Sequence, residues 1–283
     1  MENYYSTVIY YMVKVFTMVK GEADIVEDWV LYHGDLFGFR NIYVIDNYSK
    51  DGTYEILIQL KVKYGINVYR FPDYKKKGNY MTLLLRLFGK GELVFPIDID
   101  EFIVYYDKPS NNIICDNSII LNHIYSLPKL PFYKMNYIIA KMLVPTGYSR
   151  ATVESELGAY SNYGSQGKTF FDSALFKGTI DHGNHYNQGK FYLSNLCLVH
   201  FHERNLEQIK KKTYNNVLGL GFKPFDLRYL ENICRPDLMG YHHVDRQIKI
   251  LKKQFVFHVD TRDNSDIILK PLADKIHMMK YVN

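Results

Sequence analysis

Cysteine is scarce in this chain of 283 residues, which contains Cys115, Cys197 and Cys234 and no CxxC pair. Three isolated cysteines indicate neither a disulfide framework nor a zinc site, so we expect a reducing compartment, the cytoplasm. Residues 1–20 lack the basic start, apolar core and small-residue cleavage site of a signal peptide. No apolar stretch approaches the roughly 20 residues that span a bilayer, so no transmembrane segment is expected.

A strong charge of either sign is also absent. The formal net charge is +5, with 23% of the residues charged and 47% hydrophobic, which is ordinary for a globular protein with a sizeable core. The mild positive charge favours an anionic ligand but falls far short of a nucleic-acid-binding composition, so no nucleic-acid partner is expected. The lysine clusters at residues 75–77 and 210–212 are short, and we interpret each as a solvated face.

The first hundred or so residues alternate between strand and helix patterns. Apolar runs predict strands, apolar residues at helical spacing predict helices, and Gly38 and Gly65 end two of these helices. The predicted strands are residues 8–19, 42–45, 66–71 and 93–97, and the predicted helices are residues 22–37, 53–64 and 80–88. This β-α order predicts a parallel, doubly wound sheet.

The alternation breaks down after about residue 110. Predicted strands 134–144 and 190–202 flank a stretch rich in Gly and Tyr, residues 146–167, which we expect to be a long functional loop. Helices are predicted for residues 203–218, 225–233 and 244–255. The chain therefore ends in a helical segment.

Three carboxylates follow the fourth predicted strand, in Asp98-Ile99-Asp100-Glu101-Phe102. Open α/β sheets bind ligands at the carboxyl ends of their strands, and residues two apart in an extended chain point to the same side. Asp98 and Asp100 therefore face one ligand together. Adjacent carboxylates repel unless a cation or donors neutralise them, and an oxygen-rich set suits Mg²⁺ or Mn²⁺ with a phosphate-bearing substrate. The alternative, for this motif alone, is an acidic turn that closes a strand.

A second polar motif runs from Asp46 to Thr53, with the sequence Asp-Asn-Tyr-Ser-Lys-Asp-Gly-Thr. It links a short strand to a helix N-terminus, so it offers carboxylate and amide groups to a base or ribose and backbone N–H groups to an anion. The alternative is a capped β-α turn without a ligand.

Taken together, four ordered blocks resemble family 2-like glycosyltransferases, and within them the subgroup that also resembles family 92. The blocks are the segment Glu22–His33 with Trp29, the pair Gly38-Phe39, the turn 45–53 and the Asp98–Phe102 motif. They lie within the N-terminal 105 or so residues, beyond which the match is patchy. In the first block, Lys20-Gly21 replaces the Asn that the family usually has before Glu22.

The resemblance implies a GT-A-type α/β fold, a Rossmann-like α/β/α sandwich with a mixed, mainly parallel central sheet and a C-terminal helical segment. By the same analogy, residues 1–110 form the nucleotide-sugar-binding half. Residues 111–220 form the acceptor-side half of the same domain, and residues 221–283 form a C-terminal helical extension.

The resemblance also implies a hexosyl or pentosyl transferase that uses a UDP- or GDP-sugar donor, a glycan or glycoprotein acceptor, and Mn²⁺ or Mg²⁺. The residues expected to bind the donor are Glu22, Asp46, Asn47, Asp51, Asp98, Lys168 and Arg204. The residues expected to bind the metal are Asp98, Asp100, His200 and His202. His200 and His202 share one side of a predicted strand, so both can meet the site.

Most enzymes of this kind invert the anomeric carbon, which requires a base that deprotonates the acceptor hydroxyl. The base is expected outside the metal motif, and the candidates are Glu154, Glu156, Asp172 and Asp181. Glu156 is the first choice because it falls in the irregular loop where the family carries an acidic residue, and Asp181 is also retained.

Two other functions stay open. A haloacid dehalogenase-like phosphatase also uses Asp-x-Asp, with Asp98 as nucleophile and Asp100 beside it. In that class the motif follows the first strand and the fifth residue is Thr or Val, whereas the fifth residue here is Phe102. The second alternative is a non-catalytic nucleotide-sugar- or glycan-binding protein, which would need none of the three acidic residues.

Overall fold

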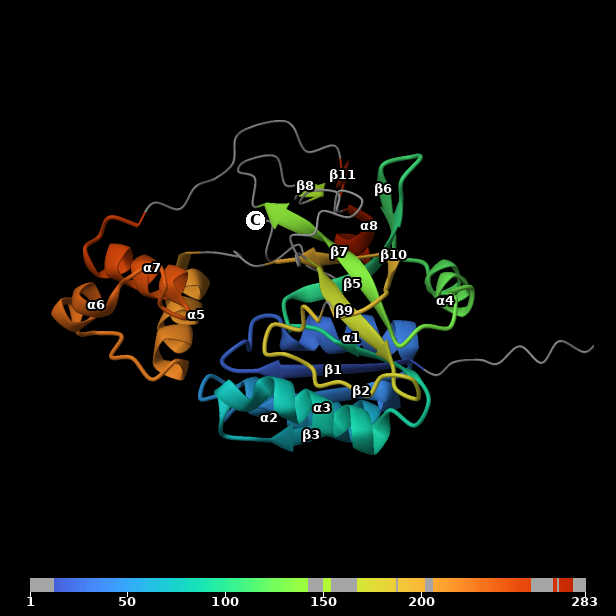
Figure 1. Ribbon diagram of the computed structural model, residues 1–283, viewed down its shortest axis with the longest axis horizontal. Helices are drawn as coiled ribbons and strands as arrows, with labels where there is room; N and C mark the ends of the chain where they lie inside the picture. The colour runs from blue at the N-terminus through green and yellow to red at the C-terminus, as the bar shows by residue number, and fades with distance from the viewer. Residues whose placement is uncertain are drawn as a thin grey trace, which may run out of the picture.

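The computed structural model of the chain describes residues 13–141, 150–153, 167–186, 188–201, 206–255, 267–268 and 270–276. Its centre is one mixed sheet (Figure 1). The strands lie in the order β3 (Asn67–Arg70), β2 (Ile42–Asp46), β1 (Val13–Val19), β4 (Leu93–Pro96), β9 (Lys168–Asp172), β7 (Phe132–Lys141), β10 (Tyr192–His200), β5 (Glu101–Asp107) and β6 (Asn112–Ile114). At one side β8 (Arg150–Val153) pairs with β7, and β11 (Ile267–Ile268) pairs with β8.

The first four strands are parallel to one another and lie in the order β3-β2-β1-β4. Their connections are α1 (Val26–Phe37), the 3₁₀ turn η1 (Phe39–Asn41), α2 (Thr53–Tyr64), the 3₁₀ turn η2 (Tyr74–Lys76) and α3 (Lys77–Phe88). The β-α alternation predicted for this half is therefore confirmed. Both glycines predicted to end helices do so with positive φ, 87° at Gly38 and 78° at Gly65.

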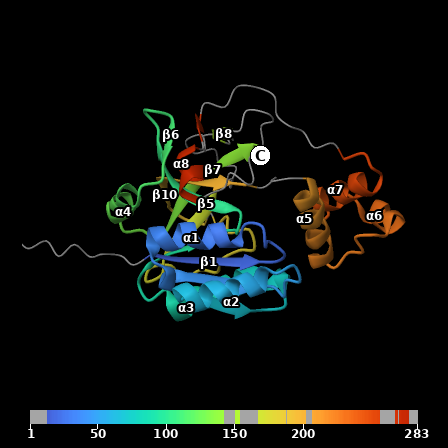
Figure 2. The same cartoon turned by 180° about the vertical axis from the view of Figure 1, so that it is seen from behind.

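Helices cover both faces of the parallel strands, as expected for an α/β/α sandwich. Along β1, Val13 and Val15 pack in the same core as α1 and α2, whereas Phe16 and Met18 pack against α3. This two-residue alternation follows from the pleat of the strand. Figure 2 shows the molecule from behind, with α1 and α2 toward the viewer.

The second half of the sheet pairs differently. Six of the ten strand pairings among the described residues are antiparallel, so the sheet is mixed as expected, but its parallel pairs are not the majority. The difference arises after β4, where the chain turns back within the acidic motif and enters β5, which runs antiparallel to β10. The sequence analysis predicted neither β5 nor the helix α4 (Asn117–Tyr125).

Three helices near the C-terminus form a separate small core. Val217 of α5 (Leu206–Gly219), Leu230 of α6 (Leu227–Ile233) and Val244 of α7 (Tyr241–Leu251) are fully buried together. This three-helix unit lies beside the sheet in both ribbon views (Figures 1 and 2). A last helix, α8 (Lys270–Ile276), returns to α1 through an ion pair of Lys275 with Asp35. No helix among the described residues is long and apolar enough to cross a membrane.

Candidate active site

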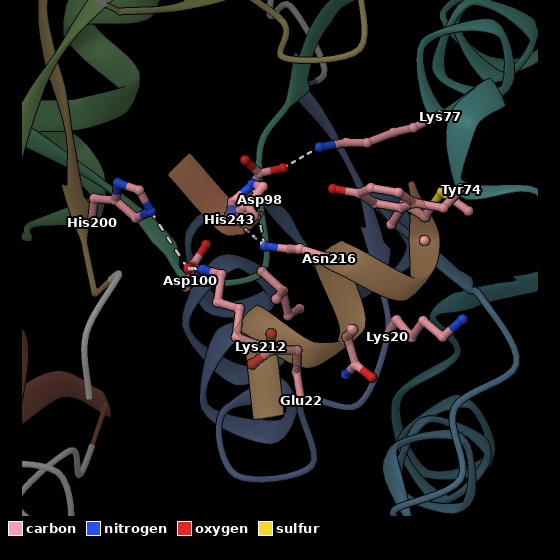
Figure 3. A pocket seen from close by; sticks show the side chains of 14 residues that line it. Lys20, Glu22, Tyr74, Lys77, Asp98, Asp100, His200, Lys212, Asn216 and His243 are labelled. Atoms are coloured by element: carbon pink, nitrogen blue, oxygen red, sulfur yellow. Dashed lines mark hydrogen bonds and ion pairs between the residues drawn. The ribbon is translucent and has the colours of Figure 1, made fainter. Parts of the chain in front are cut away.

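A pocket of about 200 Å³ opens at the carboxyl ends of β1 and β4, where the strand order reverses. Doubly wound sheets bind their ligands in the crevice at this point, because the connections leave in opposite directions there. The lining of the pocket comes from five parts of the fold (Figure 3). The lining residues are Met18, Lys20 and Glu22 at and after the end of β1, Tyr74 and Lys77 before and in α3, Asp98, Ile99 and Asp100 after β4, His200 at the end of β10, and Lys212, Asn215, Asn216, Gly219 and His243 in the three-helix unit.

Asp98 is held by two lysine ammonium groups. Lys77 donates to Oδ1, and Lys168 donates to Oδ2 at 2.7 Å. The Asp98 side chain keeps 32% of its surface exposed toward the pocket, whereas the Lys168 side chain is 2% exposed. Burial alone would raise the pKa of Asp98, but the two lysines outweigh burial and hold this pKa far below its ordinary value. The carboxylate is therefore ionised.

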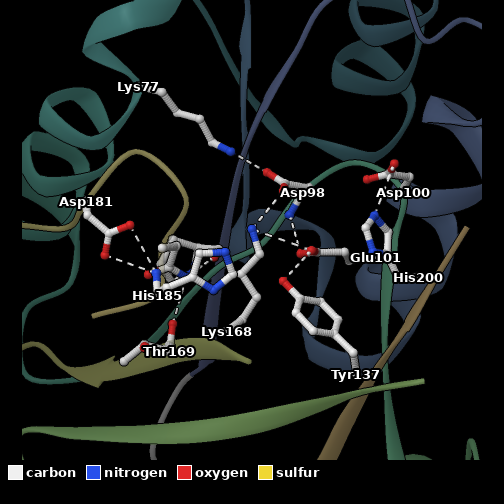
Figure 4. Close-up of polar contacts among 12 residues, drawn as sticks. Lys77, Asp98, Asp100, Glu101, Tyr137, Lys168, Thr169, Asp181, His185 and His200 are labelled. Carbon is white, nitrogen blue, oxygen red and sulfur yellow. Dashed lines mark hydrogen bonds and ion pairs between the residues drawn. The ribbon is translucent and has the colours of Figure 1, made fainter. Parts of the chain in front are cut away.

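Glu101 supports the motif from beneath and does not line the pocket. Its side chain is fully buried, and Oε2 accepts a hydrogen bond of 2.7 Å from the backbone N–H of Asp98 (Figure 4). Oε1 accepts from the Tyr137 hydroxyl at 3.1 Å and lies 3.4 Å from the Lys168 ammonium. Glu101 thus shapes the turn that presents Asp98.

Asp100 lies at the other edge of the motif, with its side chain 3% exposed. Lys212 of α5 donates to its Oδ2, and the same oxygen lies 3.4 Å from Nε2 of His200. Burial disfavours the imidazolium form of His200, but Asp100 outweighs burial and raises the pKa of His200. The structure therefore brings together Asp100 and His200, two of the residues predicted to bind a metal.

Three aromatic or imidazole side chains of α1 fix the position of β5 and so of the motif. Trp29 Nε1 donates to the Glu101 carbonyl at 2.9 Å, and the Tyr32 hydroxyl donates to the Ile103 carbonyl at 2.5 Å. His33 Nδ1 lies 2.9 Å from the Trp29 carbonyl, and Nε2 lies 3.3 Å from the Ile103 N–H. Burial lowers the pKa of His33 to about 3, so the ring is neutral and bridges helix and strand.

The turn after β2 is built differently. Asp46 is fully buried, and its carboxylate accepts from the Ser49 N–H at 3.0 Å and from Arg70 Nε at 3.0 Å. Asp51 accepts from the N–H groups of Ala23 and Thr53, both at 3.2 Å. These contacts close the turn and join it to the start of α1. Neither carboxylate lines the pocket.

Asn47 and Arg70 lie beside this turn. Asn47 is 1% exposed and donates from Nδ2 to the Phe71 carbonyl at 2.8 Å, whereas its Oδ1 has no hydrogen-bond partner among the described residues. The Arg70 guanidinium lies 4.4 Å from the ring centre of Tyr48 and 4.0 Å from that of Tyr54. Oδ1 of Asn47 is therefore a buried acceptor without a partner among the described residues, while Arg70 is clamped between two aromatic rings.

Two of the lysines that neutralise the motif were not predicted as site residues. Lys77 and Lys212 belong to the two short clusters interpreted as solvated faces, and this interpretation is wrong for both residues. One member of each cluster reaches an Asp of the motif instead. Asn216 and His243 of the three-helix unit were missed as well, and no local pattern pointed to them, because the packing of this unit brings them to the pocket.

The remaining predicted residues are placed as follows. Glu22 lines the pocket, whereas Asp181 and Asp172 do not. The Asp181 carboxylate accepts from the His185 N–H at 3.0 and 3.1 Å, and Asp172 accepts from the Ala174 N–H at 2.9 Å, so each closes a turn. Glu154, Glu156, His202 and Arg204 lie outside the described residues.

The described residues contain no cluster of three or more metal-ligating side chains. Asp100 and His200 nevertheless meet at the pocket edge, and Mg²⁺ or Mn²⁺ commonly takes one or two protein ligands together with substrate phosphates. The donor set fits a site of that kind.

Three lysines (Lys20, Lys77 and Lys212) and three carboxylates (Glu22, Asp98 and Asp100) line the pocket, so their formal charges cancel.

Comparison with known proteins gives one informative relative. A glycosyltransferase family 92 protein of Oryza sativa subsp. japonica is 31% identical over 104 residues, which cover 36% of this chain and 17% of the relative. The resemblance to family 92 is thereby supported over about a third of the chain. No family model matches the chain.

Solved structures are similar only at low level. TarS of S. aureus matches with a TM-score of 0.40 and 12% identity over 86% of this chain and 43% of that chain. A cytidylyltransferase of Leptospira borgpetersenii matches with a TM-score of 0.36 and 10% identity over 88% of this chain and 100% of that chain. Similarity at this level carries no argument about function.

Proposed function

We propose that the protein is a metal-dependent glycosyltransferase that moves a sugar from a nucleoside-diphosphate sugar to a hydroxyl group of a glycan or glycoprotein, with inversion. One observation carries the proposal: the Asp98–Glu101 motif follows β4 at the crevice where the strand order reverses, and the carboxylates of Asp98 and Asp100 face a pocket lined with lysines. The partial match to a family 92 glycosyltransferase supports it.

The lysines suit a diphosphate leaving group. As the sugar departs, negative charge grows on the β-phosphate, and ammonium groups placed beforehand in a partly enclosed pocket stabilise it. Lys77 and Lys212 both line this pocket. A Mn²⁺ or Mg²⁺ ion held by Asp100 and His200 would act as a Lewis acid on the same phosphate. Lys168 is too buried to reach a ligand and keeps Asp98 oriented.

The donor nucleotide, UDP or GDP, is assigned to the region between the pocket and the turn after β2. Asn47 is the proposed contact to the base or ribose, and its unpartnered Oδ1 is buried in the free protein, so it must become exposed when the nucleotide binds. Asp46 has both oxygens engaged, so we infer that it orients Arg70 and the turn. Glu156 remains the proposed base, because the carboxylates of Asp172 and Asp181 are occupied by turn N–H groups.

The position of the motif favours the transferase over a phosphatase. The haloacid dehalogenase pattern needs its nucleophile after the first strand, whereas Asp98 follows the fourth strand in chain order. Both oxygens of Asp98 also accept hydrogen bonds from lysines. A carboxylate held in this way is a weak nucleophile, because its lone pairs are engaged and its charge is compensated.

A reducing compartment, the cytoplasm, remains part of the proposal. Cys115, Cys197 and Cys234 are free, and burial raises the pKa of Cys115 to about 11 and that of Cys197 to about 12, so these two thiols are inert. Asn47 also begins an Asn-Tyr-Ser glycosylation sequon, yet it is 1% exposed. A glycan there would disrupt the turn.

Calorimetric titration tests the proposal. UDP and GDP are each titrated, with and without Mn²⁺, into wild type, Asp100→Ala and the control Asp237→Ala, which changes an exposed carboxylate of the three-helix unit. We expect binding of one nucleotide that needs both Mn²⁺ and Asp100 and is unchanged in the control. Hydrolysis of the matching nucleotide sugar, monitored as release of the nucleotide, then distinguishes an enzyme from a non-catalytic binding protein.

Failure has two distinct forms. If neither nucleotide binds wild type under any condition, the donor site is absent and the transferase proposal falls. If a nucleotide binds but its sugar conjugate is never turned over with any acceptor or with water, the non-catalytic binding protein becomes the better account.

A further inference from the structure

Helix α5 lies directly over the crevice and binds an acidic residue on each side of it. Lys211 pairs with Asp51 in the turn after β2, and its neighbour Lys212 pairs with Asp100 in the turn after β4. A Cβ atom added at Gly21, after β1, would lie 3.0 Å from Asn215 Nδ2 and 3.2 Å from Lys211 Cε. The helix therefore packs closely on the end of β1 and spans the two acidic turns.

Lys212 occupies the oxygen that a metal ion would need. Its ammonium donates to Oδ2 of Asp100, which is also the oxygen nearest to Nε2 of His200. The Lys212 side chain is 20% exposed and that of Asp100 is 3% exposed, so the pair is shielded from water. Two cations cannot share one poorly solvated oxygen without strong repulsion, so a metal ion must displace the lysine.

The charges around the pocket show when that displacement is favourable. Lys20, Lys77 and Lys212 balance three carboxylates, so a divalent ion alone would leave two uncompensated positive charges. A nucleoside diphosphate alone would add negative charge beside those carboxylates. Metal and diphosphate together restore the balance, and the released ammonium then has phosphate oxygens to bind.

We propose that Lys212 acts as an ammonium latch: it holds Asp100 in the free protein and transfers to the donor diphosphate when the metal ion enters. This proposal rests on the proposed function and goes beyond it. It makes the three-helix unit a part of the donor site, and it predicts that Mn²⁺ and nucleotide bind cooperatively because one side chain must leave the carboxylate before the metal can enter.

The test measures Mn²⁺ binding from the electron paramagnetic resonance signal of the free ion, with and without saturating UDP or GDP. We expect wild type to bind Mn²⁺ alone weakly and at least about tenfold more tightly with the nucleotide, within the usual range of coupling between sites. Lys212→Gln should bind Mn²⁺ alone about tenfold more tightly than wild type and should lose most of the coupling.

Two neighbouring lysines supply matched variants. Lys210→Gln changes an exposed residue that pairs with Glu207 on the same helix, and it should behave as wild type. Lys211→Gln removes the pair with Asp51 and loosens the helix while leaving Lys212 in place, so it should not raise the affinity for Mn²⁺ alone. Circular dichroism confirms that each variant is folded.

Three results would overturn the latch. The first is that wild type binds Mn²⁺ with the same affinity in the presence and absence of nucleotide, a measurement that needs no variant. The second is that Lys212→Gln keeps the wild-type affinity for Mn²⁺ and the wild-type coupling to nucleotide. The third is that Lys211→Gln raises the affinity for Mn²⁺ as much as Lys212→Gln does, which would assign the effect to helix docking. In each case nucleotide binding and turnover of the nucleotide sugar persist, whereas failure of the proposed function removes one or both.

Discussion

The turn after β2 and the turn after β4 are both acidic, yet their carboxylates have different kinds of partner. In the first turn, backbone N–H groups hold Asp46 and Asp51, with Arg70 and Lys211 as additional side-chain partners. In the second turn, the carboxylates of Asp98 and Asp100 are held by lysine side chains. Asp46 is also fully buried, whereas Asp98 is about one-third exposed, at 32%.

The difference separates a scaffold from a ligand site. A backbone N–H cannot leave its carboxylate without unfolding the turn, whereas a lysine on a flexible stem can exchange one anion for another. A carboxylate held by lysines is therefore already ionised and is released when a competing anion arrives. We infer that the first turn sets the geometry and that the second exchanges partners with the ligand.

The largest expected effect concerns the one lysine that does not exchange. Lys168 is 2% exposed between Asp98 and Glu101, so Lys168→Met would leave the buried Glu101 carboxylate without its lysine partner and Asp98 with Lys77 alone. We expect unfolding free energy to fall by about 3–5 kcal/mol, the usual cost of breaking a buried pair. Urea denaturation measures this loss, with exposed Lys177→Met as the control. If Lys168→Met lost as little unfolding free energy as Lys177→Met, Lys168 would instead be a lysine that can exchange its carboxylate partners for a ligand.

The next effect is on binding. Asp100→Asn keeps the shape of the side chain but removes the charge that faces Lys212 and His200. We expect Mn²⁺-dependent nucleotide binding to weaken at least about 100-fold, because loss of a direct ligand should exceed the 10–100-fold cost of altering an outer partner. Calorimetry measures the change. If Asp51→Asn weakened Mn²⁺-dependent nucleotide binding by the same factor, the distinction between the two turns would be wrong.

A pH experiment tests His33, the buried histidine that joins α1 to β5. The pKa of His33 is lowered to about 3 from an ordinary 6.5, so below that ordinary value the unfolded chain gains a proton that the folded protein does not. Stability should therefore fall as the pH drops, by about 2 kcal/mol at pH 5 from this residue alone. Denaturation of wild type and His33→Gln at about pH 7 and about pH 5 measures the difference. Equal losses in both proteins would show that His33 is not the source.

The smallest expected effect is on the first turn. Asp51→Ala removes the acceptor for the N–H groups of Ala23, in the turn before α1, and of Thr53, the first residue of α2. We expect a loss of about 1 kcal/mol of unfolding free energy, as for other capping carboxylates. Thermal denaturation checks this value. A variant that kept its stability but lost nucleotide binding would move Asp51 from the scaffold to the ligand site.

Much of the N-terminal half was predictable because its patterns are local. Helix α2 spans the predicted residues 53–64, and α1 ends at the predicted Gly38, since helical spacing and glycine caps act within a few residues. Strand β5 was not predicted, because it follows the acidic motif without a turn signal of its own. Helix α3 begins at Lys77, three residues before the predicted start, because Asp73 caps the preceding 3₁₀ turn.

The position of the carboxylates follows from local sequence, because a buried strand followed directly by Asp98 and Asp100 places both residues at the edge of the sheet. The groups that neutralise these carboxylates follow from long-range packing. Lys77, Lys168 and Lys212 lie 21, 70 and 112 residues from their Asp partners in the chain. A surface lysine and a site lysine look alike in sequence, since charge pairing has no period. Long-range packing brings Lys77 of one cluster to Asp98 and Lys212 of the other to Asp100.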